Sequence, residues 1–140
     1  MTRLDAKYRA GLPQLSDKIF LTDAGMETTL IFHDGVDLPL FASFDLLKSA
    51  AGTELTRGYY ARYCKLAHDA GLGFVLESPT WRANIDWAAK LGYSRTALAD
   101  INRKAIDVMA GLRSEFETPQ SPMVISGNIG PRGLAISLAN

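Results

Sequence analysis

Residues 53–78 have the sequence TELTRGYYARYCKLAHDAGLGFVLES, and this stretch decides the fold class. Its apolar side chains recur at the spacing of one helix face: Leu55, Tyr59, Tyr60, Tyr63, Cys64 and Ala67. We expect Thr53 to be the N-cap of this helix and Gly71 to mark its end. Residues 73–76 then form an unbroken apolar run, which is typical of a strand in a sheet covered on both faces. A helix that leads directly into such a strand predicts part of a βαβ unit.

The flanking segments continue this alternation. Residues 19–22 predict a short strand before the helix, and residues 123–126 predict a third strand. Residues 28–47 contain turn signals and are expected to be rich in loops. A loop and a short helix are expected over 80–93. Residues 95–116 predict a longer helix with one apolar stripe, formed by Leu98, Ile101, Ala105, Val108 and Leu112. The order strand, helix, strand, helices, strand predicts an α/β fold with a parallel sheet.

The composition is that of a globular domain. The 140 residues suit one domain, and 47% are hydrophobic and 21% charged. Fifteen basic residues balance fifteen acidic ones, so no basic surface for nucleic acid or for an anionic membrane is expected. The single cysteine, Cys64, excludes an internal disulfide and fits a reducing cytosol. The N-terminus lacks the apolar core of a signal peptide, and no run reaches the roughly 18 apolar residues of a membrane span. We therefore expect a cytoplasmic protein.

The residues after the first predicted strand suit an amino-acid head group. Ligands of parallel α/β folds gather at the carboxyl ends of the strands. Asp23 lies at such an end and could hold an ammonium group. The neighbouring Gly25 permits close approach, so that exposed backbone amides could bind a carboxylate. The alternative is that Asp23 only caps the following segment.

The end of the second predicted strand also carries polar side chains. Glu77, Ser78 and Thr80 offer a carboxylate and two hydroxyl groups, and Trp81 offers a flat apolar wall. Arg82 could pair with Glu77 or with an anion. The alternative is a connecting loop with ordinary helix capping.

Two other patterns are weaker. Cys64 and His68 stand four residues apart on the predicted helix, but a zinc site needs at least three protein ligands, so a core cysteine is the better interpretation. The segment GNIGPRG, residues 127–133, lacks the spacing of a dinucleotide-binding loop and the lysine–hydroxyl pair of a P-loop. Nucleotide binding is therefore not expected.

Three segments together resemble the homocysteine S-methyltransferase family. LTDAGMETTL, residues 21–30, is similar to the family's opening Asp-Gly-Gly-Met-(Gly/Glu)-Thr block. YYARYCKLAHDAGLGFVLESPTWRAN, residues 59–84, is similar to the next block, in which a helix runs into a strand and a Thr-containing loop. VISGNIGPRG, residues 124–133, resembles the Gly-x-(Ile/Leu)-Gly-Pro-x-Gly-Asp block of the third strand. The blocks occur in the family's order and spacing.

The resemblance implies a (β/α)8 TIM barrel, of which this chain holds roughly the first three βα units. It implies transfer of a methyl group from a small donor to the thiol of homocysteine, which yields methionine. It also implies zinc, held by three cysteines of later strands, which makes the thiol a thiolate. By resemblance, Asp23 holds the substrate's amino group, and the amides at Gly25 and Met26 receive its carboxylate. Ser78 and Thr80 match the second-strand loop that lines the homocysteine pocket.

The departures from the family pattern set further expectations. We expect a lead-in over 1–16, the barrel part over 17–133 and a non-matching tail over 134–140, since Leu134 stands where the family has aspartate. The family's second glycine is Ala24 here. The zinc cysteines are absent, and a full barrel takes about 250 residues. We therefore expect a truncated form that is inactive alone. The alternative is a non-catalytic half-barrel that self-associates or pairs with a separate C-terminal half.

Overall fold

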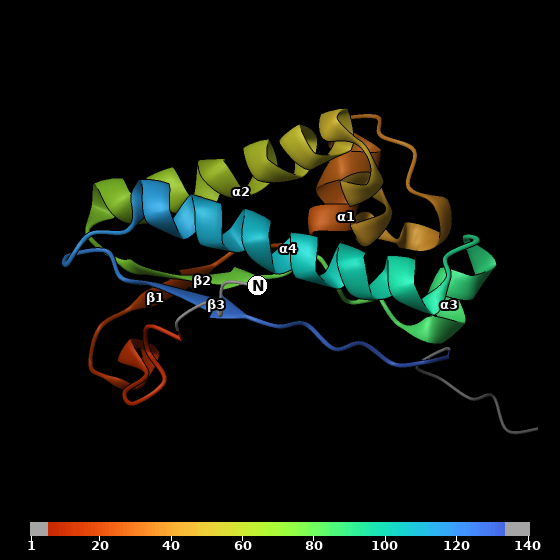
Figure 1. Cartoon of the computed structure of the whole chain (residues 1–140). Coiled ribbons are helices and arrows are strands. Elements are labelled where there is room, and N and C mark those ends of the chain that lie inside the picture. The colour runs from red at the N-terminus through yellow and green to blue at the C-terminus, as the bar shows by residue number, and fades with distance from the viewer. Residues whose placement is uncertain (1–5, 134–140) are drawn as a thin grey trace, which may run out of the picture.

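A computed structural model describes residues 6–133, and its centre is a small parallel sheet (Figure 1). The strands are β1 (Phe20–Thr22), β2 (Gly73–Glu77) and β3 (Met123–Ser126), arranged in the order β1-β2-β3. Both neighbouring pairs are parallel. The α/β class and the parallel sheet predicted from the sequence are therefore confirmed, and the first strand begins one residue later than predicted.

Two long helices cover one face of this sheet (Figure 1). They are α2 (Ala50–Ala70), which connects β1 to β2, and α4 (Arg95–Phe116), which precedes β3. A parallel connection has to carry the chain back along the sheet, and a helix does this while it satisfies its own backbone groups. The N-terminal segment, with its short 3-10 helix η1 (Pro13–Leu15), lies on the opposite side of the sheet.

The main core lies between the helices and the sheet. It contains twelve buried residues: Met26, Leu30, Leu38, Tyr59, Tyr60, Cys64, Ala67, Phe74, Leu76, Met109, Leu112 and Met123. Paired residues of parallel strands point to the same face, and Phe74 pairs with Met123 toward the helices. Val75 stays only half-buried on the other face. The sequence analysis predicted a sheet covered on both faces. Within residues 6–133 the helices cover one face, and the other face, on the side of the N-terminal segment, is only partly covered.

Helix α2 begins earlier than the sequence analysis predicts. Its N-cap is Ser49, whose hydroxyl accepts a hydrogen bond from the amide of Gly52 at 3.0 Å. Thr53, the predicted cap, lies in the first turn, and its hydroxyl donates to the carbonyl of Ser49 at 2.7 Å. The helix ends at Gly71, as predicted. The small residues 50–52 carry no apolar pattern of their own, which is why periodicity missed this first turn.

The segment between β1 and α2 is more helical than expected. It contains α1 (Met26–Thr28), the π-helix η2 (Thr29–His33), and the 3-10 helices η3 (Pro39–Phe41) and η4 (Ser43–Lys48). Each helix is short, and turn residues at 34–38 separate η2 from η3. The sequence therefore shows this break more clearly than the helices themselves. The predicted short helix α3 (Ile85–Lys90) and the predicted long helix α4 are confirmed.

Glu117 joins the N-terminal segment to the start of β3. Its carboxylate accepts hydrogen bonds from Lys7 Nζ, from the Tyr8 hydroxyl at 2.6 Å and from the Met123 amide at 2.8 Å. Burial raises the pKa of Glu117, but these three donors outweigh it and the net pKa is lowered. The predicted polar lead-in is therefore attached to the domain from residue 7 onward.

No helix within residues 6–133 is long and apolar enough to cross a membrane.

Candidate functional site

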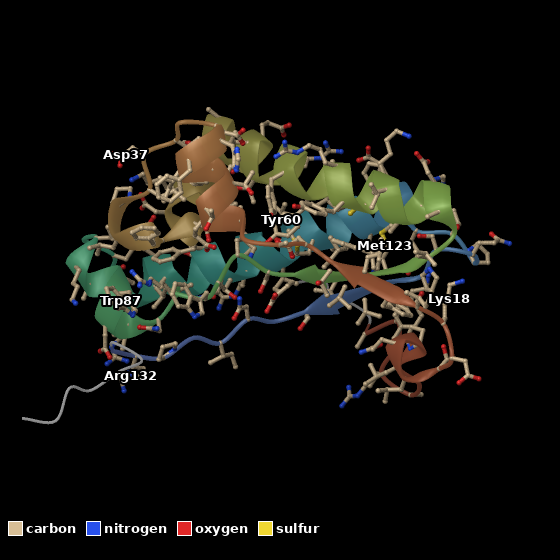
Figure 2. The ribbon with its side chains drawn as sticks, turned by 180° about the vertical axis from the view of Figure 1, so that it is seen from behind. Lys18, Asp37, Tyr60, Trp87, Met123 and Arg132 are labelled. Carbon is tan, nitrogen blue, oxygen red and sulfur yellow. The ribbon has the colours of Figure 1, made fainter. Side chains whose placement is uncertain are left out.

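A cavity of about 130 Å³ lies where the carboxyl ends of the three strands meet. It is lined by Asp23, Gly25, Met26, Glu27, Tyr60, Glu77, Ser78, Pro79, Trp81 and Asn128. Figure 2 shows Tyr60 between α2 and the sheet. Four of the five residues predicted from the sequence therefore line one cavity, namely Asp23, Gly25, Met26 and Ser78.

Helix α2 fixes the orientation of Asp23. The hydroxyl of Tyr59 donates to Asp23 Oδ2 at 2.9 Å and to the carbonyl of Ala24 at 3.1 Å. Burial raises the pKa of Asp23, while the hydrogen bonds from Tyr59 and from its own backbone amide lower it in part. The carboxylate of Glu27 raises it further. The capping alternative for Asp23 is wrong, because the N-cap of α1 is Gly25, with no side-chain hydrogen bond.

The cavity is strongly acidic. Asp23, Glu27 and Glu77 line it, and within residues 6–133 no lysine, arginine or histidine does. Glu27 accepts a hydrogen bond from the Ser43 hydroxyl at 2.8 Å, which fixes one of its oxygens. The partly buried Asp23 carboxylate favours a cationic group, because an opposite charge compensates part of its desolvation. An ammonium group, with three donors, fits this set of acceptors.

Gly25 gives the chain its turn after β1. Its φ of 59° lies in the left-handed region, where a side chain would be strained. This turn starts the helical run of α1 directly beside the cavity, and the first amides of a helix have no partner within it. Met26 is buried behind the turn. The amides at Gly25 and Met26 are thus placed beside the carboxylates of the cavity.

Ser78 and Thr80 connect the second strand end to the third. Their hydroxyl oxygens lie 2.8 Å apart, and Thr80 Oγ1 also donates to the carbonyl of Asn128 at 2.7 Å. The amide of Asn128 donates to Ser78 Oγ at 3.2 Å. Thr80 does not line the cavity. Thr80 instead contacts the Ser78 hydroxyl and the Asn128 carbonyl, and so supports two residues that do line the cavity.

Arg82 does not take either of the roles expected for it. Its guanidinium lies 4.6 Å from the ring centre of Trp81 and 4.1 Å from that of Trp87, and it donates to the carbonyl of Leu40. The two indole faces attract this cation, and Arg82 does not line the cavity. The alternative of an ordinary capped loop holds only for Asn84, whose Oδ1 caps α3.

The described residues do not form a zinc site. Within residues 6–133 no group of three or more His, Cys, Asp or Glu side chains is placed to hold a metal ion. Cys64 is fully buried, and burial raises its pKa to about 12, so the thiol stays protonated. His68 points to solvent and pairs with Asp69. The interpretation of Cys64 as a core residue fits this structure.

Four residues of the site were missed by the sequence analysis. Tyr59 and Tyr60 were assigned only to the core face of α2, although the Tyr59 hydroxyl reaches Asp23 and Tyr60 lines the cavity. Glu27 and Asn128 line the cavity, and both stand inside the blocks that carry the family resemblance. For Glu27 the available signal was its position four residues after Asp23, whereas Asn128 stands 50 residues after Ser78 and has no such local signal.

Comparison with known proteins gives one match. The family model described as homocysteine S-methyltransferase matches residues 20–139. No curated protein and no solved structure matches the chain.

Proposed function

Because the chain belongs to the homocysteine S-methyltransferase family, we propose that its acidic cavity binds the amino-acid head of homocysteine. The observation that carries this proposal is the geometry of Asp23, a partly buried carboxylate that Tyr59 orients. Among the residues that the structure describes, two further carboxylates and no basic side chain line its cavity. A buried acid of this kind costs stability unless a cation binds to it.

In this proposal each end of the head group has its own partner. The ammonium group donates to Asp23, which is held ready by the Tyr59 hydroxyl, and the Glu27 and Glu77 charges add attraction. The substrate carboxylate accepts from the backbone amides at Gly25 and Met26, which are the hydrogen-bond donors at the turn after β1. Ser78, with Thr80 behind it, fixes the opposite wall through Asn128.

We further propose that the three βα units belong to a TIM barrel and that the bound thiol accepts a methyl group from a small donor, in the cytoplasm. Zinc is the expected thiol activator of the family, but Cys64 and the carboxylates described here do not fit a zinc site. The residues of this chain therefore bind and orient the substrate, and no bond-making step is assigned to them.

A binding comparison tests the proposal. Calorimetric titration with homocysteine is compared with 4-mercaptobutyrate, which lacks the amino group, and with butyrate. Binding of homocysteine that exceeds both acids, and that Asp23→Asn removes, is the expected result. Equal binding of homocysteine and 4-mercaptobutyrate would contradict the role of Asp23.

A second candidate function is a non-catalytic module that self-associates or pairs with a separate half-barrel. Within residues 6–133 the outer edges of β1 and β3 pair with no further strand. Beside β3 lies a groove of about 380 Å³ whose apolar wall includes Leu12, Ile106 and Val124. Open edges of this kind pair readily with other strands. Sedimentation velocity tests the self-associating form of this candidate, which predicts one defined oligomer and which a purely monomeric chain would contradict.

A further inference from the structure

The loop after β3 is fastened to α3 rather than free at the end of the sheet. The carbonyl of Pro131 accepts two hydrogen bonds, from Asn84 Nδ2 at 3.2 Å and from Trp87 Nε1 at 3.3 Å. Trp87 is buried, so its indole N–H needs a partner of this kind. Two side chains from the start of α3 therefore converge on one backbone oxygen of the loop.

An ion pair one residue later also joins the loop to α3. Arg132 donates to Asp86 through Nε and Nη2, each at 2.9 Å. This two-point arrangement fixes the orientation of both groups as well as their distance. The hydrogen bonds from Arg132 hold the pKa of Asp86 below its ordinary range. Figure 2 shows Trp87 and Arg132 together at one end of the structure.

The fastened loop forms one wall of the cavity. Asn128 lines the cavity and precedes the fastened residues by three positions. Between them, Gly130 lies so close to Trp81 that an added Cβ would overlap the Trp81 carbonyl oxygen and indole ring. A shift at residues 131–132 is therefore transmitted through a close backbone contact to both Asn128 and Trp81.

We propose that Asp86 and Arg132, with Asn84 and Trp87, form a clasp that positions the loop of residues 127–133 as a wall of the amino-acid cavity. Asp86 and Arg132 are then positioning residues, which touch no substrate and act through Asn128 and Trp81. The ligand class, an amino acid with a free ammonium group, rests on the function proposed above.

The chain carries its own reporter for this clasp. Trp81 and Trp87 are its two tryptophans, and both contact the loop. Acrylamide quenching of tryptophan fluorescence therefore measures whether the loop covers the indole rings, with or without a ligand. Arg132→Gln opens the ion pair without altering α3, whereas a change at Asp86 or Asn84 would also disturb the first turn of that helix.

The expected result is that Arg132→Gln increases quenching and weakens homocysteine binding by about two- to fivefold, the range expected from loss of an exposed ion pair. Arg132→Lys keeps the charge, so we expect it to retain part of the protection from quenching and part of the homocysteine affinity that Arg132→Gln loses. The matched control is Arg103→Gln, which opens an exposed ion pair with Asp100 on α4 and should change neither.

Two outcomes would overturn the clasp. One is unchanged quenching in Arg132→Gln, and the other is increased quenching with wild-type affinity. If the wild-type chain binds no homocysteine, the function proposed above fails, and the quenching comparison alone decides whether the loop is fastened. Unfolding midpoints of all variants separate loop opening from a global loss of structure.

Discussion

Tyr59→Phe is the most direct perturbation of the cavity, because it removes one oxygen atom and keeps the ring. The ring of Tyr59 is about 1% exposed and packs against Tyr60 with centroids 5.2 Å apart, and this packing survives the substitution. The variant loses the hydrogen bonds to Asp23 Oδ2 and to the carbonyl of Ala24. Any change in binding can then be traced to the orientation and ionisation of Asp23.

The expected loss of homocysteine affinity in Tyr59→Phe follows from the strength of the hydrogen bond between Tyr59 and Asp23. A hydrogen bond to a charged group contributes about 1.5–3 kcal/mol. Asp23 keeps part of its surface in water, which screens the interaction, so the lower end applies. We expect homocysteine binding to weaken by about tenfold, which corresponds to about 1.4 kcal/mol.

The pH dependence of homocysteine affinity gives a second, independent test of the role of Asp23. The Tyr59 hydrogen bond lowers the pKa of Asp23, so its removal raises that pKa further. Binding of the ammonium group requires ionised Asp23, and affinity falls as the pH drops through this pKa. Affinity in Tyr59→Phe should therefore begin to fall at a higher pH than in the wild type, measured by calorimetry between about pH 4 and about pH 8.

Tyr93→Phe is the matched control for this experiment. The Tyr93 hydroxyl donates to Asp45 Oδ1 at 2.6 Å, outside the cavity lining. Both variants lose a tyrosine–carboxylate hydrogen bond, but only Tyr59→Phe should change affinity. Wild-type affinity and an unshifted pH profile in Tyr59→Phe would refute the assignment of Asp23 as the ammonium partner.

Three further predictions concern the ionisable groups. Burial raises the pKa of Asp23, so its ionisation opposes folding as the pH rises through that pKa. Asp23→Asn should therefore raise the free energy of unfolding at pH 7 by about 0.5 kcal/mol while it removes binding, and a loss of stability in urea titrations would contradict this. The net pKa of Glu117 is lowered, so its contribution is present at neutral pH and lost as the pH falls through that pKa. Glu117→Gln should cost about 1 kcal/mol at pH 7 and nothing in acid, whereas an equal cost at both would argue against the Lys7 contact. The Cys64 thiol, with its pKa of about 12, should react with Ellman's reagent only at the rate of unfolding, and fast labelling of the native chain would show that it is accessible.

The long elements were predictable from the sequence because their signals are local. The apolar stripe of α4 and the run into β2 each lie within one segment of the chain, and both predictions agree with the structure. The start of α2 was not predictable in this way. Ser49 precedes three small residues without an apolar pattern, so the first turn depends on a cap that periodicity does not detect.

Of the residues that line the cavity, the sequence predicts only those that follow closely on a strand. Asp23 and Ser78 follow strands, and parallel strands bring their carboxyl ends to one edge. The role of Thr80 depends on the carbonyl of Asn128, which is 48 residues away in the chain, and no local pattern shows that contact. The same holds for the ion pair between Asp86 and Arg132.

Two adjacent residues of α2 connect the core to the cavity. The Tyr59 hydroxyl reaches Asp23 after β1, and the Tyr60 hydroxyl donates to the carbonyl of Glu77 at the end of β2, at 2.7 Å. Neighbouring residues on a helix point about 100° apart, so one helix can reach both strand ends only if its rotation against the sheet is fixed. Cys64, one turn further along, is fully buried in the same core and resists rotation of α2, because moving it would leave a void. The apolar face that defines the fold in the sequence is therefore also the feature that orients the carboxylate in the cavity.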